Sequence, residues 1–191
     1  QSQFSPINIL DKSWIIPTWH KIQDNKAINL ILDPGLAFGT GAHATTHLCL
    51  IWLLKNVNRN LTVLDYGCGS GILGIAAKKI GAKKVFGVDI DNQAIKSSQG
   101  NAEMNNVEIF WSNAENTKDY KTDLVVANIL SSALSVLAPV LAEHCNTKGK
   151  IALSGILEKQ EGDLKKIYGR WFDFEPSHYQ DGWVLISGIK R

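Results

Sequence analysis

Apolar and polar residues recur along this chain with two periods, one typical of strands and one typical of helices. Short apolar runs predict strands at 28–32, 61–64, 85–88, 107–111, 123–127 and 150–154. Helical patterns lie at 43–55, 72–80, 92–105, 130–141 and 158–169. Pro139 falls inside the fourth of these and should kink or restart that helix. Two further strands, near 171–175 and 183–187, should close the chain as a hairpin.

Strands and helices that alternate with short connections predict an α/β fold. Right-handed crossovers then give a parallel sheet with helices on both faces, and the closing strand pair adds one antiparallel edge. Residues 1–27 have weaker periodicity and contain Pro6 and Pro17. We therefore expect residues 1–27 to form a linker or arm and residues 28–191 to form one domain.

Composition supports a single globular domain with no strong charge. The chain has 191 residues, 45% of them hydrophobic and 20% charged, and a formal net charge of +2. This balance argues against a protein that holds nucleic acid through bulk charge, although it leaves room for a small basic patch. Three scattered cysteines with no C-x-x-C pair argue against a disulfide framework or a cysteine-based zinc site, and fit a reducing cytosol.

One uncharged stretch raises the question of a membrane. Residues 124–142 carry no charge and approach the length that spans a bilayer. Asn128, three serines and Pro139 interrupt the stretch, and its period changes from strand to helix. Two consecutive soluble elements explain this pattern better than a membrane span.

A glycine-rich turn follows the strand at 61–64. Residues 65–71 read D-Y-G-C-G-S-G and lead directly into a helix. Glycines let the backbone approach a ligand closely, and a helix start offers unpaired N–H groups. Residues 69–74 match G-x-G-x-x-G, but in that fingerprint the first glycine directly follows the strand, whereas Asp65 and Gly67 come first here. Asp65 suits a ligand with an ammonium group, such as S-adenosylmethionine, and would repel a pyrophosphate.

Two further polar residues stand where predicted strands end. Asp89 lies 22 residues after Gly67 and could accept hydrogen bonds from both hydroxyls of a ribose. It could instead cap the helix at 92–105, for which Asp91 or Asn92 is the expected N-cap. Asn128 ends the strand at 123–127. Its amide oxygen could accept a hydrogen bond from an amine and aim the amine lone pair at an electrophilic methyl group. Asn128 could equally cap the next helix, and its spacing leaves both readings open.

A loop of small residues precedes the first predicted helix. Residues 32–46 read L-D-P-G-L-A-F-G-T-G-A-H-A-T-T, a composition typical of a loop that folds over a ligand. His43 could act as a base or as a hydrogen-bonding brace, and the Thr46 hydroxyl could bond back to its own helix. The six tryptophans are scattered without interleaved basic residues, which favours packing over stacking on nucleic acid.

Together these motifs resemble the methyltransferases that modify large-subunit ribosomal protein eleven. The segments D-P-G-L-A-F-G-T-G-x-H-x-T-T, D-x-G-C-G-S-G-I-L, G-V-D-I-D and V-V-A-N-I-L occur in that family's order. The first is long and highly specific, and the second is shared by most class I methyltransferases. The resemblance runs from about Trp14 to Arg191. It implies a Rossmann-like class I methyltransferase fold, with a seven-stranded, mostly parallel sheet and a C-terminal antiparallel hairpin.

The resemblance also implies a cofactor and a reaction. The cofactor would be S-adenosylmethionine, and its contacts carry over to Phe38, Thr46, Asp65, Gly67, Gly69, Asp89 and Asn128. Asn128 would be the catalytic residue, orienting a neutral lysine or N-terminal amine of a large-subunit ribosomal protein for direct in-line methyl transfer. No metal is implied.

This chain departs from the family pattern in two ways. Ala42 and Ala44 stand where the family loop usually has threonine and proline. The family's small N-terminal substrate-recognition domain is also missing, so we expect this form to bind the ribosomal protein weakly or not at all.

Other functions remain open at this stage. They are methylation of another amine such as a nucleobase, a low-activity cofactor-binding module associated with the ribosome and, least favoured, a dinucleotide-dependent oxidoreductase. We expect a cytoplasmic monomer without a DNA or membrane partner.

Overall fold

The computed structural model describes residues 6–17, 21–22, 24–32, 42–117 and 119–191. Its helices are α1 (Ala42–Asn56), α2 (Ile72–Ile80), α3 (Asn92–Met104), α4 (Ser131–His144) and α5 (Glu161–Tyr168), with short 3-10 helices η1 (Ala114–Asn116) and η2 (Glu158–Gln160). Its strands are β1 (Ile7–Ile9), β2 (Ser13–Pro17), β3 (Ile28–Leu32), β4 (Thr62–Tyr66), β5 (Lys84–Asp89), β6 (Phe110–Asn113), β7 (Thr122–Asn128), β8 (Cys145–Leu157), β9 (Phe172–Phe174), β10 (His178–Gln180) and β11 (Trp183–Lys190). Each predicted helix and strand has a counterpart.

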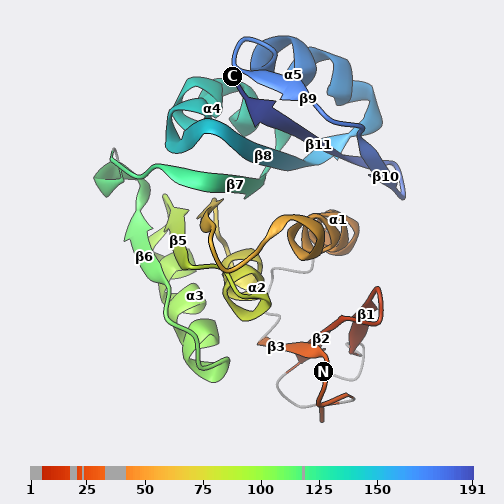
Figure 1. Ribbon diagram of the computed structural model, residues 1–191, viewed down its shortest axis with the longest axis vertical. Helices are drawn as coiled ribbons and strands as arrows, with labels where there is room; N and C mark the ends of the chain where they lie inside the picture. Colours follow the sequence, from red (N-terminus) through yellow and green to blue (C-terminus); the bar gives the residue numbers. More distant parts are fainter. Residues whose placement is uncertain (1–5, 18–20, 23, 33–41, 118) are drawn as a thin grey trace.

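The main sheet has the mostly parallel arrangement that the alternating pattern predicts. Seven strands lie in the order β10-β11-β8-β7-β4-β5-β6, and β9 is an eighth strand beside β11 (Figure 1). The pairs from β8 across to β6 are parallel. β11 is antiparallel to β8, and β9 and β10 are antiparallel to β11, so the expected antiparallel end is present.

The order of the strands reverses between β4 and β7. From β4 the chain passes outward through β5 to β6, and it then returns to place β7 on the other side of β4. In an open α/β sheet such a reversal leaves a crevice at the carboxyl ends of the two central strands, where ligands bind. The glycine-rich turn after β4 and Asn128 at the end of β7 therefore meet at one edge of the sheet.

Helices cover both faces of the main sheet. One core cluster packs α1 and α2 against the sheet through side chains such as Leu53 and Ile75. The other packs α4 and α5 against the opposite face, with Leu134 and Tyr168 fully buried. Burial between layers explains why α1 is apolar nearly all round: it contacts β8 and β11 on one side and β1 on another.

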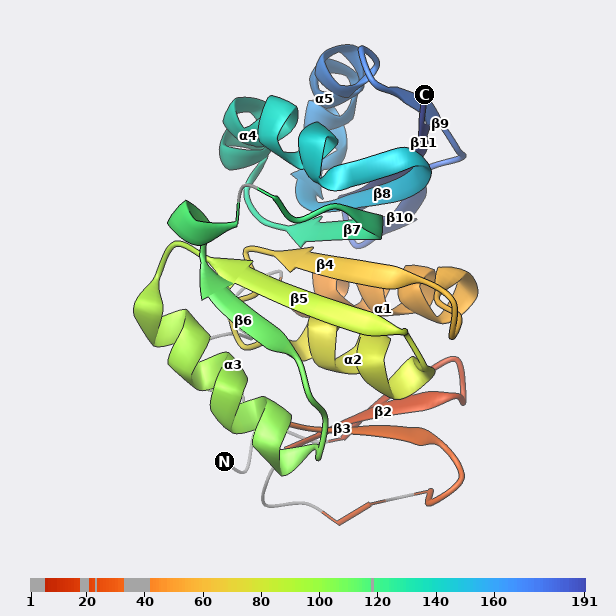
Figure 2. The same ribbon diagram turned by 60° about the vertical axis from the view of Figure 1, so that its left-hand side comes forward.

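The first three strands form a small sheet of their own. β1 and β2 are antiparallel, and β2 is parallel to β3. Figure 2 shows this sheet on the far side of α2 from the main sheet. Residues 1–27 thus include two strands that pair with each other, and the second of them, β2, also pairs with β3. The side chains of Ile9 in β1 and Ile15 in β2 belong to the first core cluster. The division of the chain at residue 27 stays a prediction.

Most predicted elements differ from the observed ones by a few residues at a boundary, and for three of them the structure shows where the difference arises. The strand expected at 107–111 is β6 at Phe110–Asn113, because the Val107 N–H bonds back to Ala102 at the end of α3 and pairing with β5 starts at Phe110. β8 begins five residues before the predicted strand, at Cys145, which pairs with Thr122 of β7. The helix expected at 158–169 is divided into η2 and α5.

Pro139 does not restart a helix. α4 runs from Ser131 to His144 with the proline inside it. Within the described part of the chain, no helix is long and apolar enough to cross a membrane.

Candidate functional site

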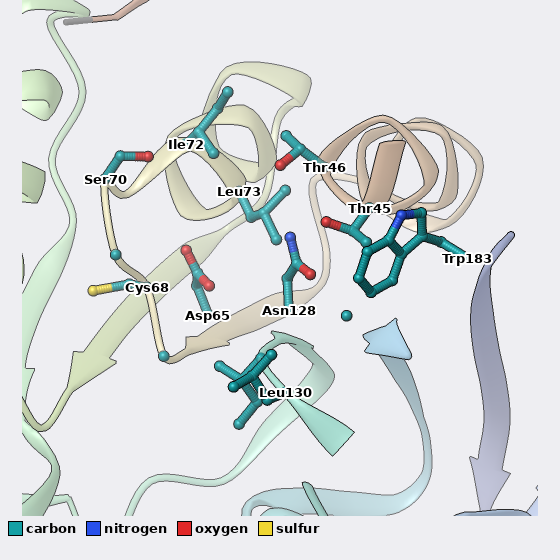
Figure 3. A pocket seen from close by; sticks show the side chains of 14 residues that line it. Thr45, Thr46, Asp65, Cys68, Ser70, Ile72, Leu73, Asn128, Leu130 and Trp183 are labelled. Carbon is teal, nitrogen blue, oxygen red and sulfur yellow. The ribbon is translucent and has the colours of Figure 1, made fainter. Parts of the chain in front are cut away.

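A cavity of about 330 Å³ opens at the carboxyl ends of β4 and β7 (Figure 3). It lies at the crevice that the strand order creates. The described residues that line it are Thr45, Thr46, Asp65, Gly67, Cys68, Gly69, Ser70, Ile72, Leu73, Asn128, Ile129, Leu130, Gly155 and Trp183.

Glycines shape the backbone around this cavity at two strand ends. Gly67 has a φ of +77°, and a Cβ there would lie 2.5 Å from Cγ2 of Ile129. Gly155 has a φ of +85°, and a Cβ there would lie 2.3 Å from the carbonyl oxygen of the same residue. Only glycine tolerates both the left-handed backbone and this close approach. The two glycines therefore leave room for Ile129, which lies against Gly67 on one side and against Gly155 of β8 on the other.

The glycine-rich turn is held by polar groups on both sides. The N–H groups of Gly67 and Cys68 both donate to the Val88 carbonyl of β5, at 2.7 and 2.9 Å. From α3, the buried Ser98 hydroxyl donates to the Gly69 carbonyl at 2.8 Å. Asn101, also buried on α3, donates to the Ser70 carbonyl at 2.8 Å. These contacts fix the turn before any ligand arrives.

Asp65 presents a buried carboxylate to the cavity. The side chain is 1% exposed, and one oxygen accepts a hydrogen bond of 2.9 Å from the Gly74 N–H of α2. The pKa of Asp65 is raised to about 7, chiefly because burial disfavours the charge; the Gly74 hydrogen bond opposes this rise and the Asp89 charge adds to it. None of the described residues that line the cavity is basic. This carboxylate therefore lacks a cation, which a ligand could supply.

Asp89 stands beside the cavity rather than in its lining. One carboxylate oxygen accepts from the Gly69 N–H at 3.0 Å and the other from the Asp91 N–H at 2.9 Å. The helix cap is Asp91, which accepts from Gln93 at 2.9 Å, so capping does not explain Asp89. A carboxylate has about four lone-pair sites, so acceptor capacity remains for a ligand hydroxyl.

Asn128 ends β7 and lines the cavity. The N-cap of the following helix is Leu130, not Asn128. The capping alternative is therefore wrong. Figure 3 shows the Asn128 amide between Asp65 on one side and Trp183 on the other. This places a hydrogen-bond acceptor near the middle of the cavity.

Five of the predicted site residues thus share one cavity: Thr46, Asp65, Gly67, Gly69 and Asn128. Asp89 does not line the cavity itself, but its carboxylate accepts a hydrogen bond from the N–H of Gly69, which does. Phe38 and most of the small-residue loop, residues 33–41, lie outside the described residues.

Two other lining residues, Gly155 and Trp183, are not among the site residues predicted from the sequence. Gly155 directly follows the strand predicted at 150–154 and lies near the carboxyl end of β8, at the same edge as Gly67 and Asn128, so its position was a usable signal. Trp183 opens β11, which runs antiparallel to β8, and it pairs with Leu157. The first residue of an antiparallel strand lies at the edge where the parallel strands end, but no sequence signal indicated that the Trp183 side chain would line the cavity.

Sequence comparison places the chain among known proteins. The profile of the family described as "Ribosomal protein L11 methyltransferase (PrmA)" matches residues 1–191. Proteins named ribosomal protein L11 methyltransferase from Methylobacillus flagellatus and Chromobacterium violaceum are 55% and 52% identical to it. Both alignments cover 100% of this chain, which spans only 65% and 64% of the length of those relatives.

Solved structures show the same fold. The crystal structure of a ribosomal protein L11 methylase from Lactobacillus delbrueckii subsp. bulgaricus matches with a TM-score of 0.89 and 30% identity, over 98% of each chain. A 16S rRNA methyltransferase from T. thermophilus matches with a TM-score of 0.67 and 24% identity, over 81% of this chain and 45% of its own. The second likeness concerns the fold alone.

Proposed function

Since this chain belongs to the ribosomal protein L11 methyltransferase family, we propose that it transfers methyl groups from S-adenosylmethionine to amines of a large-subunit ribosomal protein. The amines we propose are lysine side chains and the N-terminal amine. The partner is the ribosomal protein for which the family is named.

One observation carries the proposal: a buried carboxylate faces a cavity whose described lining has no basic residue. The raised pKa of Asp65 means that its charge is costly there unless a cation binds. The ammonium group of S-adenosylmethionine fits this requirement, whereas the pyrophosphate of a dinucleotide would bring two more negative charges. The glycine turn fits as well, because a Cβ at Gly69 would meet nothing within 4 Å, which leaves room for a ligand against the backbone.

Each residue around the cavity would then contact a different part of the cofactor. Asp65 pairs with the ammonium group, and Asp89 accepts hydrogen bonds from the ribose hydroxyls. The buried Thr46 of α1 supplies a hydroxyl at the cavity wall. Phe38 remains part of the proposed contact set on the strength of the family resemblance.

Asn128 would hold the acceptor amine. Its amide oxygen accepts a hydrogen bond from the amine N–H, which points the nitrogen lone pair toward the reacting carbon. The cofactor supplies an electrophilic methyl group on sulfur. Positioning of the two reactants and exclusion of water then provide the catalysis. The lysine amine loses its proton to solvent before it attacks.

Calorimetry and a methyl-transfer assay test this proposal. We expect binding of S-adenosylmethionine without binding of NAD, and transfer of radiolabelled methyl groups to purified ribosomal protein L11. Tight NAD binding with no response to S-adenosylmethionine would overturn it. The assay should also be run with the longer chain of a relative, since the present chain spans about 65% of that length.

Replacing Asn128 tests the assigned catalytic role. We expect Asn128→Ala to lower the rate constant of transfer by about 10²-fold, because the amine loses its orientation. The dissociation constant of S-adenosylmethionine should change much less. Asn146→Ala, on β8 at the opposite edge of the sheet, serves as the control and should leave both values near wild type. Equal losses of rate and cofactor affinity would reduce Asn128 to a cofactor contact.

A further inference from the structure

Trp183 forms the wall of the cavity beyond Asn128. The residue is half-buried, and part of its side chain packs against the first core cluster. In Figure 3 the side chains of Asp65, Asn128 and Trp183 lie in that order across the cavity. If the cofactor ammonium lies at Asp65, the indole stands at the end where the acceptor amine must enter.

The structure holds this tryptophan firmly in place. Trp183 follows a tight turn in which Asp181 and Gly182 have φ values of +52° and +82°. The residue paired with it across the hairpin is Gln180. The Gln180 Oε1 lies 2.6 Å from Nδ1 of His47 on α1. The hairpin is thus tied to the helix that also brings Thr45 to the cavity.

Each successive methylation changes the interactions by which the enzyme can bind the amine. Each added methyl group removes an N–H, so an acceptor such as the Asn128 amide has fewer hydrogen bonds to receive after each transfer. A methylated ammonium remains a cation, however, and its methyl groups make it easier to strip of water. The face of an aromatic ring attracts such cations, and tryptophan attracts them more strongly than the other aromatic side chains.

We propose that Trp183 is a specificity-determining residue of the acceptor site, which binds partly methylated amines and so allows one amine to receive several methyl groups. This inference rests on the proposed methyltransferase function. In each round the amine, after losing a proton to solvent, forms a new C–N bond with its lone pair. The C–S bond breaks and its electron pair stays on sulfur. Every round consumes one new molecule of S-adenosylmethionine.

The distribution of products tests the proposal. Ribosomal protein L11 is incubated with the enzyme and S-adenosylmethionine, and mono-, di- and trimethylated forms are quantified by mass spectrometry. We expect Trp183→Leu to lower the ratio of trimethylated to monomethylated product severalfold, and Trp183→Phe to retain most of it. Trp171→Leu is the matched control, because Trp171 packs against the other core cluster. A uniform fall in all products, with an unchanged ratio, would show that Trp183 only packs and would overturn the proposal.

A binding measurement separates this proposal from the methyltransferase assignment. The probes are a peptide with trimethyllysine and its neutral isostere, in which carbon replaces the charged nitrogen. With the product S-adenosylhomocysteine bound, wild type should prefer the cation by about 2-fold to 30-fold, and Trp183→Leu should lose that preference. No preference in wild type, or no binding of either peptide, overturns the role of Trp183. Absence of any methyl transfer with the preference intact would count against the proposed reaction instead.

Discussion

Asp65 shows how one residue can combine a structural and a chemical role. Its carboxylate is fully buried and hydrogen-bonds the Gly74 N–H in the first turn of α2, so it helps to join β4 to that helix. The same burial disfavours its charge. The folded protein therefore holds a proton on Asp65 over a pH range in which the unfolded chain has already lost it.

This difference predicts a pH-dependent stability. The pKa of Asp65 rises from 3.8 to about 7 on folding, so between about pH 4 and pH 7 the native state binds more protons than the unfolded state. The free energy of unfolding should therefore fall as the pH rises from about 4 to about 7, and Asp65 should contribute at most about 4 kcal/mol to this fall. Asp65→Asn should remove that part of the fall, as measured by urea unfolding at several pH values.

Asp123 provides the control for this experiment. Burial alone would raise its pKa, but hydrogen bonds from Thr62 and Asn146, together with the Lys83 charge, outweigh burial and lower the pKa. Its contribution is present above about pH 4 and is lost only as the pH falls below that value. Asp123→Asn should therefore leave the slope between pH 4 and pH 7 unchanged. An unchanged slope in Asp65→Asn would mean that Asp65 is ionised throughout.

The elements around the glycine-rich turn are joined by polar contacts rather than by apolar packing alone. α3 is mostly exposed and polar, yet Ser98 and Asn101 are buried and donate to carbonyls of the turn. Ser98 also lies 3.4 Å from the sulfur of Cys68. These contacts link the second crossover helix to the ligand cavity.

A matched pair of serines tests this link. Ser98→Ala should cost about 0.5–1.5 kcal/mol of stability, because it removes the hydrogen bond that the buried Ser98 hydroxyl donates to the Gly69 carbonyl. We also expect a severalfold loss of affinity for S-adenosylmethionine, since the turn becomes less rigid. Ser97→Ala, on the exposed side of the same helix, should change neither value. Unfolding midpoints and calorimetric dissociation constants decide between these outcomes, and equal effects of the two substitutions would contradict the link.

The elements that sequence predicted best are those with strong local signals. α2 begins at Ile72 and ends before Gly81 as predicted, because a glycine precedes it and another terminates it. The predictions failed where tertiary pairing outweighed local preference. β8 starts at Cys145 because Cys145 pairs with Thr122 of β7, and the register then shifts before the next pair, Leu124 with Lys150, across a stretch that includes Lys148 in a left-handed conformation. No local pattern encodes such a pairing.

The cavity residues follow the same rule. Asp65, Gly67 and Asn128 could be named from sequence because each lies at or directly after the carboxyl end of a buried parallel strand. Trp183 could not, because its place depends on the turn before it and on the hydrogen bond between Gln180 and His47. Residues brought to a site by antiparallel strands require the fold itself.

At the scale of the whole molecule, the small N-terminal sheet joins the rest of the protein through buried side chains. Ile9, Ile15 and Leu30 are all at most 2% exposed and belong to the same cluster as α1 and α2. The side chain of Asn105 on α3 binds both the N–H and the carbonyl of Ile31, which fixes β3 against that helix. A segment packed in this way should unfold together with the larger sheet.

We therefore expect one cooperative unfolding transition for the small sheet and the main sheet. Ile9→Ala should lower the stability of the whole molecule by about 2–5 kcal/mol, because it empties space in a shared core. Leu10→Ala is the control: Leu10 directly follows Ile9 but is 47% exposed, so its loss should cost little. Hydrogen exchange should show protection falling together in β3 and in β4 of the Ile9→Ala variant. Two separate transitions, with only the first shifted, would instead make residues 1–27 an appended arm.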